Sequence, residues 1–229
     1  MAEHIGIVGV SAEGAALCYR TICTDGAELM GRHAHPEVSM HTHPLSEYMR
    51  GIETGDWEDV GRLMLSSAQK LAGIGADFIA CPDNTVHQSF DWVAERSPLP
   101  WLHIAEEVAS DAEQRGFKRV GVLGTRYLME GPVYAMKLSA IGIEHETPEQ
   151  LERGRINQII FDELVYGRFT ESSRDYFSGV IRRLKDKGCD AVVLGCTEIP
   201  LLIGEGDSPL PTLDSTRILA RAALRRATR

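Results

Sequence analysis

Two short segments of the chain carry residue types that perform acid–base chemistry, and each follows an apolar run. In Leu194-Gly-Cys-Thr-Glu-Ile-Pro200, Cys196 stands in a Gly-flanked turn before a predicted helix. Helix N-terminal amides near such a turn favour the thiolate, which is the reactive form of cysteine. Most free cysteines are buried and inert, however, so this segment taken alone favours a structural role. Cys189, which lies at the start of the same run, is predicted to be structural.

The second segment is Cys81-Pro-Asp-Asn-Thr-Val-His87, which follows the apolar run at 78–80. Asp83 brings a carboxyl group that can accept or donate a proton. Asn84 and Thr85 bring amide and hydroxyl donors that can hold a carboxylate. Asn and Thr also cap turns, which is the alternative interpretation of both residues.

Short apolar runs alternate with amphipathic stretches along the chain. The predicted strands are Ile5–Val10, Glu37–His41, Phe78–Cys81, Trp101–Ile104, Arg119–Leu123 and Ala191–Leu194. The predicted helices are Trp57–Ile74, Ala105–Arg115, Gly131–Ala140, Glu149–Val165 and Ser172–Lys187, with a solvated final helix over Arg221–Arg229. This alternation is typical of parallel sheets covered by helices on both faces, so the predicted fold class is α/β.

A repeat relates the two halves of the chain. Ile5-Gly-Ile-Val-Gly9 is echoed by Val120-Gly-Val-Leu-Gly124. Gly75-Ala-Asp77 and the strand after it are echoed by Gly188-Cys-Asp190 and its own following strand. In each half, a strand leads from Gly-x-Asp to a polar cluster that contains cysteine.

The repeat predicts two pseudosymmetric lobes, each a parallel sheet flanked by helices. We expect an N-terminal lobe of residues 1–100 plus 214–229 and a C-terminal lobe of residues 101–213. Ligands of open α/β sheets bind beyond the carboxyl ends of the strands. The active site is therefore expected in the cleft between the lobes.

Three motifs together resemble the aspartate/glutamate racemase superfamily: Leu194-Gly-Cys-Thr-Glu198, Asn84-Thr-Val-His87 and Ile5-Gly-Ile-Val-Gly9. The similarity covers nearly the whole chain, including Pro211-Thr-Leu-Asp-Ser-Thr216, which looks like the late Asp-Ser motif of the family. The resemblance implies an enzyme without cofactor, in which two acid/base residues, one per lobe, serve opposite faces of the substrate Cα. Inversion of a stereocentre requires that arrangement. The expected activity is PLP-independent racemisation or epimerisation of an amino acid or related small carboxylate.

One of the two acid/base residues departs from the usual family pattern. Relatives commonly read Pro-Cys-Asn-Thr-x-His where this chain reads Pro82-Asp-Asn-Thr-Val-His87, so Asp83 replaces the first cysteine. Cys81 is the alternative, although Pro82 is expected to end the strand and leave Cys81 packed in the lobe. We expect Cys196 and Asp83 to form the catalytic pair. Their reference pKa values differ, at about 8.5 and 3.9, and burial of the carboxyl group would narrow that gap.

The resemblance also implies a set of substrate-binding residues. They are Ser11, Asn84, Thr85, Thr125, Thr197 and Glu198. Leu128 stands where relatives carry a second threonine, and Val165-Tyr166 stands where acid-specific members carry a lysine. An uncompensated buried carboxylate is costly, so a neutral or apolar substrate side chain is predicted, with Arg50 as the one candidate cation.

Four histidines cluster at His33, His35, His41 and His43, and the His-x-His spacing invites a zinc interpretation. No carboxylate accompanies them at the spacing of a recognised metal site. We therefore expect surface or pocket-edge histidines and no metal.

Composition restricts the remaining possibilities. The 229 residues carry a formal charge of −9, which argues against binding to nucleic acid phosphates. No apolar run approaches the ~20 residues of a membrane span, and residues 1–5 do not resemble a secretory signal. Five cysteines without zinc or redox spacing favour reduced thiols, so a cytoplasmic protein is expected. The expected partners are a small-molecule carboxylate and a second copy of the chain, as a homodimer.

Two other functions remain open on the same scaffold. A carboxylate–thiol pair also suits one-way chemistry, as in a decarboxylase or a cis–trans isomerase of a small diacid. A catalytically inactive small-molecule-binding homologue is the other alternative, although the complete Leu194-Gly-Cys-Thr-Glu198 motif speaks against it.

Overall fold

A computed structural model describes residues 2–204 and 206–229 of the chain and divides it into two compact units. Unit 1 comprises Met1–Glu107 and Thr216–Arg229, and unit 2 comprises Val108–Ser215. The chain leaves unit 1 within the helix α5 (Ile104–Gln114) and returns to it within the helix α11 (Ser215–Ala227). Each unit contains one sheet of its own.

The sheet of unit 1 has four parallel strands in the order β2-β1-β3-β4. These strands are β1 (Ile5–Gly9), β2 (Val38–Thr42), β3 (Phe78–Ala80) and β4 (Trp101–Leu102). The remaining elements are α1 (Ala12–Met30), α2 (Leu45–Thr54), α3 (Trp57–Gly73), the 3₁₀ helix η1 (Thr85–Ser89) and α4 (Phe90–Ala94). The two central strands are buried along their whole length, which accounts for their continuous apolar sequence.

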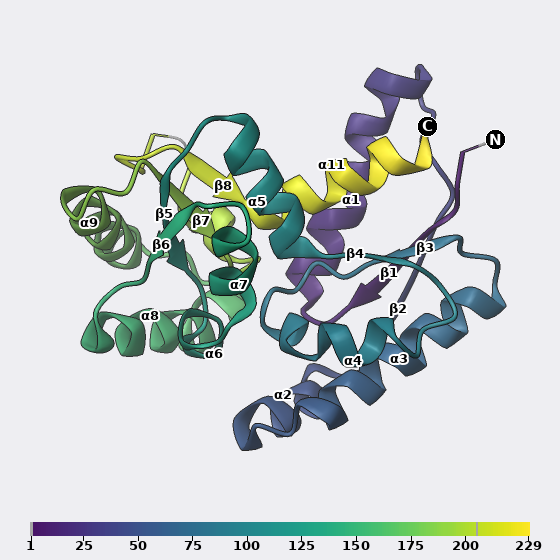
Figure 1. Ribbon diagram of the computed structural model, residues 1–229, viewed down its shortest axis with the longest axis horizontal. Helices are drawn as coiled ribbons and strands as arrows, with labels where there is room; N and C mark the ends of the chain where they lie inside the picture. The colour runs from purple at the N-terminus through teal and green to yellow at the C-terminus, as the bar shows by residue number, and fades with distance from the viewer. Residues whose placement is uncertain (1, 205) are drawn as a thin grey trace. The chain divides into compact units, whose positions relative to one another are not determined.

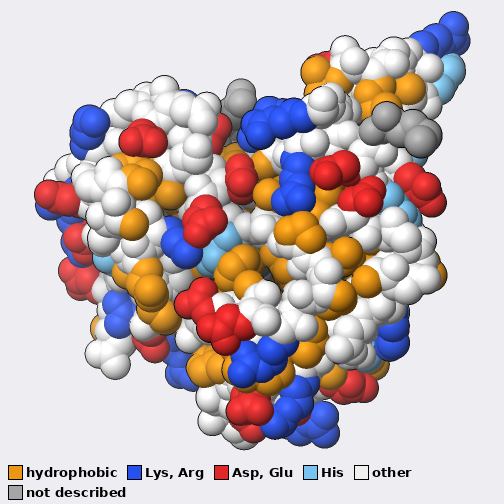
Figure 2. All heavy atoms as spheres, turned by 45° about the vertical axis from the view of Figure 1, so that its right-hand side comes forward, with side chains coloured by type: hydrophobic (Ala, Val, Ile, Leu, Met, Phe, Trp, Pro, Cys, Tyr) orange, Lys and Arg blue, Asp and Glu red, His pale blue; other side chains and the backbone are white. Residues whose placement is uncertain are grey.

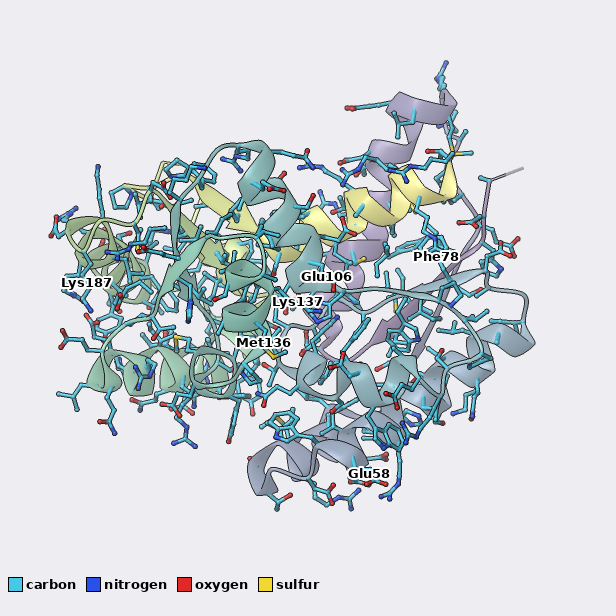
Figure 3. The ribbon with its side chains drawn as sticks, viewed as in Figure 1. Glu58, Phe78, Glu106, Met136, Lys137 and Lys187 are labelled. Atoms are coloured by element: carbon cyan, nitrogen blue, oxygen red, sulfur yellow. The ribbon has the colours of Figure 1, made fainter. Side chains whose placement is uncertain are left out.

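Helices cover both faces of this sheet (Figure 1). One face packs in a core with α1, α5 and α11, whose buried side chains include Cys18, Ile22, Ile104 and Leu219. On the other face α3 lies under the sheet, with α2 and α4 beside it. Phe78 projects from β3 toward α11 (Figure 3), where the Arg226 guanidinium lies 4.3 Å from the centroid of its ring.

The sheet of unit 2 repeats the same topology, with four parallel strands in the order β6-β5-β7-β8. These strands are β5 (Arg119–Leu123), β6 (Glu144–Glu146), β7 (Ala191–Leu194) and β8 (Thr212–Asp214). The remaining elements are α6 (Arg126–Glu130), α7 (Val133–Ser139), α8 (Gln150–Asp162), the 3₁₀ helix η2 (Leu164–Tyr166), α9 (Glu171–Asp186) and α10 (Ile199–Leu202). Its main core joins α8, α9 and α10 to the central strands through residues such as Ile159, Phe177 and Val192.

The repeated Gly-x-Asp motif has the same structural role in both units. Gly75 and Gly188 both have φ of +91°, a left-handed conformation that glycine adopts without strain. Two residues later, Asp77 Oδ2 accepts a hydrogen bond of 2.7 Å from the backbone N–H of His4, just before β1. Asp190 Oδ2 accepts the equivalent bond of 2.7 Å from Lys118, just before β5. The motif therefore joins the start of each third strand to the start of its neighbour.

The α/β class and the predicted strands are confirmed, with boundary changes of one to two residues at four of the six. The sequence analysis missed the strands β6 and β8 and the helices α1, α2, α4 and α6. The final helix was predicted to be solvated over Arg221–Arg229, but α11 begins at Ser215 and buries one side, including Leu219 and Ala223, in the core of unit 1. Strand β6 reads Glu-His-Glu at a sheet edge and lacks the apolar signal of a buried strand. Helix α1 contains Gly14, Gly26, Thr21 and Thr24, which weaken helical propensity, and it depends on packing against the sheet.

The face shown in Figure 2 carries interspersed charges of both signs. Hydrophobic side chains collect at the projecting end of α1, where Leu29 and Met30 are exposed. Among the residues described, no helix combines the length and the apolarity that crossing a bilayer requires.

Candidate active site

The Cys196 turn follows directly on β7 in unit 2. Cys196 is half-buried, and its thiol donates a hydrogen bond of 3.0 Å to Glu198 Oε2. The hydroxyl of Thr197 donates to the same oxygen at 2.8 Å. Both Thr197 and Glu198 are buried, with 3% of their surface exposed. The buried Glu198 carboxylate thus fixes the position of the Cys196 sulfur by a hydrogen bond, while part of Cys196 remains exposed to solvent.

Two glycines let this turn lie close to the end of β5. The backbone N–H of Gly195 donates to Leu123 O at 2.7 Å. A Cβ added at Gly195 would lie 2.8 Å from that oxygen, and one at Gly124 would lie 3.0 Å from Gly195 O. The Leu128 side chain fills the remaining space, 2.6 Å from either added Cβ, and is itself buried. Leu128 therefore supports the Cys196 turn from within unit 2.

The predicted residue Thr125 begins α6 at the end of β5. Its Oγ1 accepts a hydrogen bond of 3.2 Å from Leu128 N, so the side chain caps the helix. The late Asp-Ser motif also reaches this region, since Ser215 Oγ donates to Leu194 O at 2.9 Å. Tyr134 is buried against the same turn; burial raises its pKa, and a hydrogen bond with Ser215 opposes that rise. The sequence analysis did not identify Tyr134, because a tyrosine in a helix carries no local signal of such a contact.

In unit 1 the corresponding turn follows β3. Asp83 is half-buried, and its Oδ1 accepts a hydrogen bond of 3.2 Å from Val86 N in η1. The buried His87 spans the turn: Ile104 N donates to its Nε2 at 3.3 Å, which leaves Nδ1 to donate to Asp83 O at 2.6 Å. Asn84 and Thr85, at 2% and 6% exposure, are buried in the same turn.

Cys81 lies in the interior of unit 1. Its exposed fraction is 0%, and burial raises its pKa well above the ordinary value, with the Asp83 carboxylate raising it further. Cys81 is therefore held as a neutral thiol, which is a poor base. Tyr48 on α2 is also buried; burial raises its pKa, and the Asp83 carboxylate is among the groups that raise it further.

Ser11 follows the carboxyl end of β1, the strand that pairs with β3. Its Oγ accepts a hydrogen bond of 3.2 Å from Gly14 N and caps α1. Within unit 1, the adjacent carboxyl ends of β1 and β3 thus bring together four predicted residues, Ser11, Asp83, Asn84 and Thr85. Within unit 2, the adjacent ends of β5 and β7 bring together the other four, Thr125, Cys196, Thr197 and Glu198.

Of the four clustered histidines, two come together. The rings of His41 and His43 lie 4.9 Å apart, while His33 sits in an exposed turn with φ of +64°. His41 Nε2 accepts from Lys70 Nζ at 3.0 Å, so a cation occupies the position that a metal would take. Across the described residues, no group of three or more His, Cys, Asp or Glu side chains is placed to hold a metal ion.

Two residues considered for the substrate pocket lie at the surface of their own units. Arg50 on α2 is exposed. Tyr166 in η2 is 72% exposed and lies under the Arg168 guanidinium, 5.6 Å from its ring centroid. Within its own unit, each side chain is therefore exposed to solvent, unlike a group that forms a buried ion pair.

Comparison with known proteins agrees with this arrangement. A crystal structure of a Yersinia pestis protein provisionally assigned as an Asp/Glu racemase has 34% sequence identity and a TM-score of 0.90, over 99% of this chain and 100% of that one. An aspartate racemase homologue from Pyrococcus horikoshii OT3 is 29% identical, with a TM-score of 0.85 over the whole of both chains. A broad specificity amino-acid racemase from Bacillus subtilis (strain 168) is 24% identical over 191 residues, which cover 83% of this chain and 81% of that protein. The Asp/Glu/hydantoin racemase family matches residues 7–223. The chain is therefore an isomerase that belongs to the Asp/Glu/hydantoin racemase family.

Proposed function

We propose that the enzyme is a cofactor-independent racemase or epimerase of an amino acid or related small carboxylate, with Cys196 and Asp83 as its two acid/base groups. The observation that carries the proposal is their matched position. Asp83 follows β3 and Cys196 follows β7, and these strands occupy equivalent places in two sheets of identical topology. Each side chain is half-buried, so each retains an open side.

In the proposed reaction, one group removes the Cα proton and the other returns a proton to the opposite face of Cα. Starting from the Asp83 carboxylate, the Cα–H electron pair moves into an enediolate, and the Cys196 thiol then protonates the carbon. The reverse direction begins with the Cys196 thiolate and a protonated Asp83. A carboxylic acid and a thiol differ by several pKa units in reference peptides, about 3.9 against 8.5, so forward and reverse rates need not be equal.

We assign Glu198 as a positioning residue for the sulfur rather than as a ligand of the substrate carboxylate. Its Oε2 already accepts hydrogen bonds from Cys196 and Thr197. A second carboxylate brought against it would be repelled, since like charges in a partly dry site destabilise one another. The donors for the substrate carboxylate, and for the charge that develops on it, are then Asn84 and Thr85 in unit 1.

For the substrate, we propose a neutral or apolar side chain. Leu128 replaces a hydroxyl beside the Cys196 turn, and no lysine stands before Gly167. Without a cation, an acidic substrate side chain would lose its hydration without compensation.

The test is proton NMR in D2O with a panel of L- and D-amino acids, neutral and acidic, and with small diacids. The wild-type enzyme should introduce deuterium at Cα and invert configuration, faster for neutral than for acidic amino acids. Cys196→Ser should abolish turnover, because a hydroxyl is a far weaker acid than a thiol. Asp83→Asn should lose inversion while keeping Cα–H exchange from the Cys196 side. Asp83→Cys should retain some racemisation.

The matched control is Cys81→Ala, which removes the buried thiol two residues from Asp83 and should leave turnover largely intact. If Cys81→Ala were inactive while Asp83→Asn kept full activity, Cys81 would be the second base. Consumption of a diacid without Cα exchange in any amino acid would instead indicate a decarboxylase or cis–trans isomerase.

We further propose that the enzyme works in the cytoplasm as a homodimer, with a small carboxylate as its substrate and no nucleic acid or membrane partner. All five cysteines are free thiols, which suits a reducing compartment. Light scattering of the purified protein at several concentrations tests the dimer directly.

A further inference from the structure

The first turn of α5 is bonded to two histidine rings. The four N-terminal amides of a helix have no partner within the helix and must find one elsewhere. The backbone N–H of Ile104 donates to His87 Nε2 at 3.3 Å, and that of Ala105 donates to His103 Nδ1 at 3.1 Å. The next two amides donate to the backbone carbonyl of His103. His103 directly precedes the helix, whereas His87 belongs to η1, so the His87 ring joins the start of α5 to another element.

These bonds determine which nitrogen of His87 carries the proton. A backbone N–H can only donate, so His87 Nε2, which accepts from Ile104, carries no hydrogen. The ring then has its proton on Nδ1, which lies 2.6 Å from the backbone carbonyl oxygen of Asp83. A carbonyl oxygen can only accept, so this second contact requires the same proton position. Both bonds therefore need a neutral imidazole that is protonated at Nδ1.

Packing holds the His87 ring in the orientation that makes both bonds. The residue is buried, with 3% of its surface exposed. Its ring stacks on that of Phe90, with centroids 5.6 Å apart and planes 9° apart, and lies 4.8 Å from the ring of His103. At the end of η1, Ser89 Oγ donates to Trp57 O at 2.6 Å, which ties this helix to the start of α3. In so closely packed a cluster the ring has little room to turn away from its two hydrogen-bond partners.

We propose that His87 is a positioning residue for Asp83, whose backbone it fastens to the first amide of α5. The hydrogen bond from Val86 N to Asp83 Oδ1 is local to the turn, whereas Ile104 lies 17 residues beyond His87 in the chain. The His87 ring therefore places the Asp83 turn relative to a separate helix of unit 1. Such support matters because a reacting group must be held within about 0.5 Å of its productive position. The inference rests on the proposed role of Asp83 as an acid/base group.

The decisive measurement separates the two faces of the substrate Cα. If His87 acts through Asp83, its loss should slow proton transfer by Asp83 and leave proton transfer by Cys196 intact. Inversion needs both groups, whereas Cα–H exchange with retention of configuration needs Cys196 alone. The enantiomer that Asp83→Asn still exchanges in D2O is the one whose proton faces Cys196. Starting from that enantiomer, proton NMR and chiral chromatography give the ratio of exchange with retention to inversion, which is the readout.

Two variants of His87 divide its contacts. His87→Phe keeps a ring against Phe90 and removes both hydrogen bonds. We expect inversion to fall roughly ten- to a hundredfold, the effect of misplacing a reacting group by about 1 Å, while exchange with retention stays near the wild-type rate. His87→Asn should recover part of the inversion, because its amide can donate to Asp83 O although it is too short to reach Ile104 N. Inversion and exchange that fall in proportion, or an Asn variant no more active than the Phe variant, would overturn the proposal.

The matched control is His4→Phe. His4 is a buried histidine of the same unit that also bonds through both ring nitrogens, with Gly75 O and Ser39 Oγ each at 2.9 Å, but it precedes β1 at the amino end of the strands. This change should lower the melting temperature and leave the ratio of exchange to inversion unaltered; a shift as large as that of His87→Phe would overturn the proposal.

A spectrum of the wild-type enzyme tests the same geometry without a variant that could fail to fold. In 15N NMR at neutral pH, His87 should be protonated at Nδ1 and unprotonated at Nε2. The opposite tautomer would contradict both hydrogen bonds, and with them the proposal.

The Asp83→Asn background separates this inference from the proposed function. The Cα–H exchange that Asp83→Asn retains should not respond to His87→Phe, because the carboxylate that His87 positions is already absent. Full racemisation by Asp83→Asn would refute the proposed function itself. Loss of inversion in Asp83→Asn, together with wild-type inversion in His87→Phe, would refute the inference alone.

Discussion

The cysteines show how strongly the surroundings of one side chain decide its chemistry. Burial raises the pKa of Cys18 to about 12 and that of Cys189 to about 11, and it holds Cys81 well above the ordinary thiol range. These three thiols are inert at neutral pH. Cys196 differs because it is half-buried, follows a sheet strand and donates its thiol proton to the buried Glu198 carboxylate.

Labelling with iodoacetamide at neutral pH tests this difference at the residue scale. Cys196 should react before Cys18, Cys81 and Cys189, and a bound substrate-like carboxylate should protect it. Glu198→Gln should slow the reaction, because an amide holds and accepts the thiol proton less well than a carboxylate. Peptide mass spectrometry reads each site separately. Equal labelling of all five cysteines, or no protection by any carboxylate, would argue against an active-site sulfur.

At the scale of elements, the ends of two neighbouring strands form the Cys196 turn. The loops after β5 and β7 approach so closely that glycine is needed at Gly124 and Gly195, and Leu128 packs against both positions. The shape of the turn therefore depends on backbone contacts between segments that are about 70 residues apart in sequence, the spacing that a βαβ crossover with added elements produces. Neither loop sequence alone predicts these contacts.

Gly195→Ala should destabilise unit 2 by about 1–3 kcal/mol and reduce activity strongly, because its Cβ would meet Leu123 O and Leu128. The control is Gly154→Ala in α8, where nothing lies within 4 Å of the added Cβ. That change should stabilise the protein by about 0.5–1 kcal/mol through helix propensity and leave activity unchanged. Urea unfolding and turnover measure both effects. A Gly195→Ala enzyme as stable and active as Gly154→Ala would show that the turn tolerates a side chain.

At the scale of the whole molecule, both units bury ionisable groups in neutral form. Cys18 and Tyr48 in unit 1 and Tyr134 in unit 2 all have pKa values raised mainly by burial. Each loses its proton at lower pH in the unfolded chain than in the folded one. Stability is therefore present in full below the unfolded pKa and is lost as pH rises toward the folded value.

The free energy of unfolding should fall between pH 9.0 and about 12, where Cys18 is ionised only in the unfolded state. This thiol alone contributes a slope of up to about 1.4 kcal/mol per pH unit. Cys18→Ala loses some packing at every pH but should show a shallower alkaline decline than the wild type. Urea unfolding at a series of pH values measures the two slopes. Parallel curves would mean that Cys18 does not carry the alkaline sensitivity.

The sequence alone determined the family, the α/β class and the repeat, because these reside in local patterns. Apolar runs predicted six strands, and the two Gly-x-Asp motifs marked equivalent strand starts, whose structural roles proved to be the same. The edge strand β6 was missed because a strand at the edge of a sheet can pair through its backbone while its side chains stay polar and exposed. Helix α1 was missed because its packing against β1, and not its propensity, stabilises it.

Only the tertiary structure decided how the side chains of each site are bonded. The thiol of Cys196 donates a hydrogen bond to Glu198, a contact that the sequence did not indicate. The burial of Cys81 and of Tyr48 depends on how helices pack on a sheet. Such contacts join residues far apart in the chain, and their energies depend on distance and desolvation, which no linear pattern records.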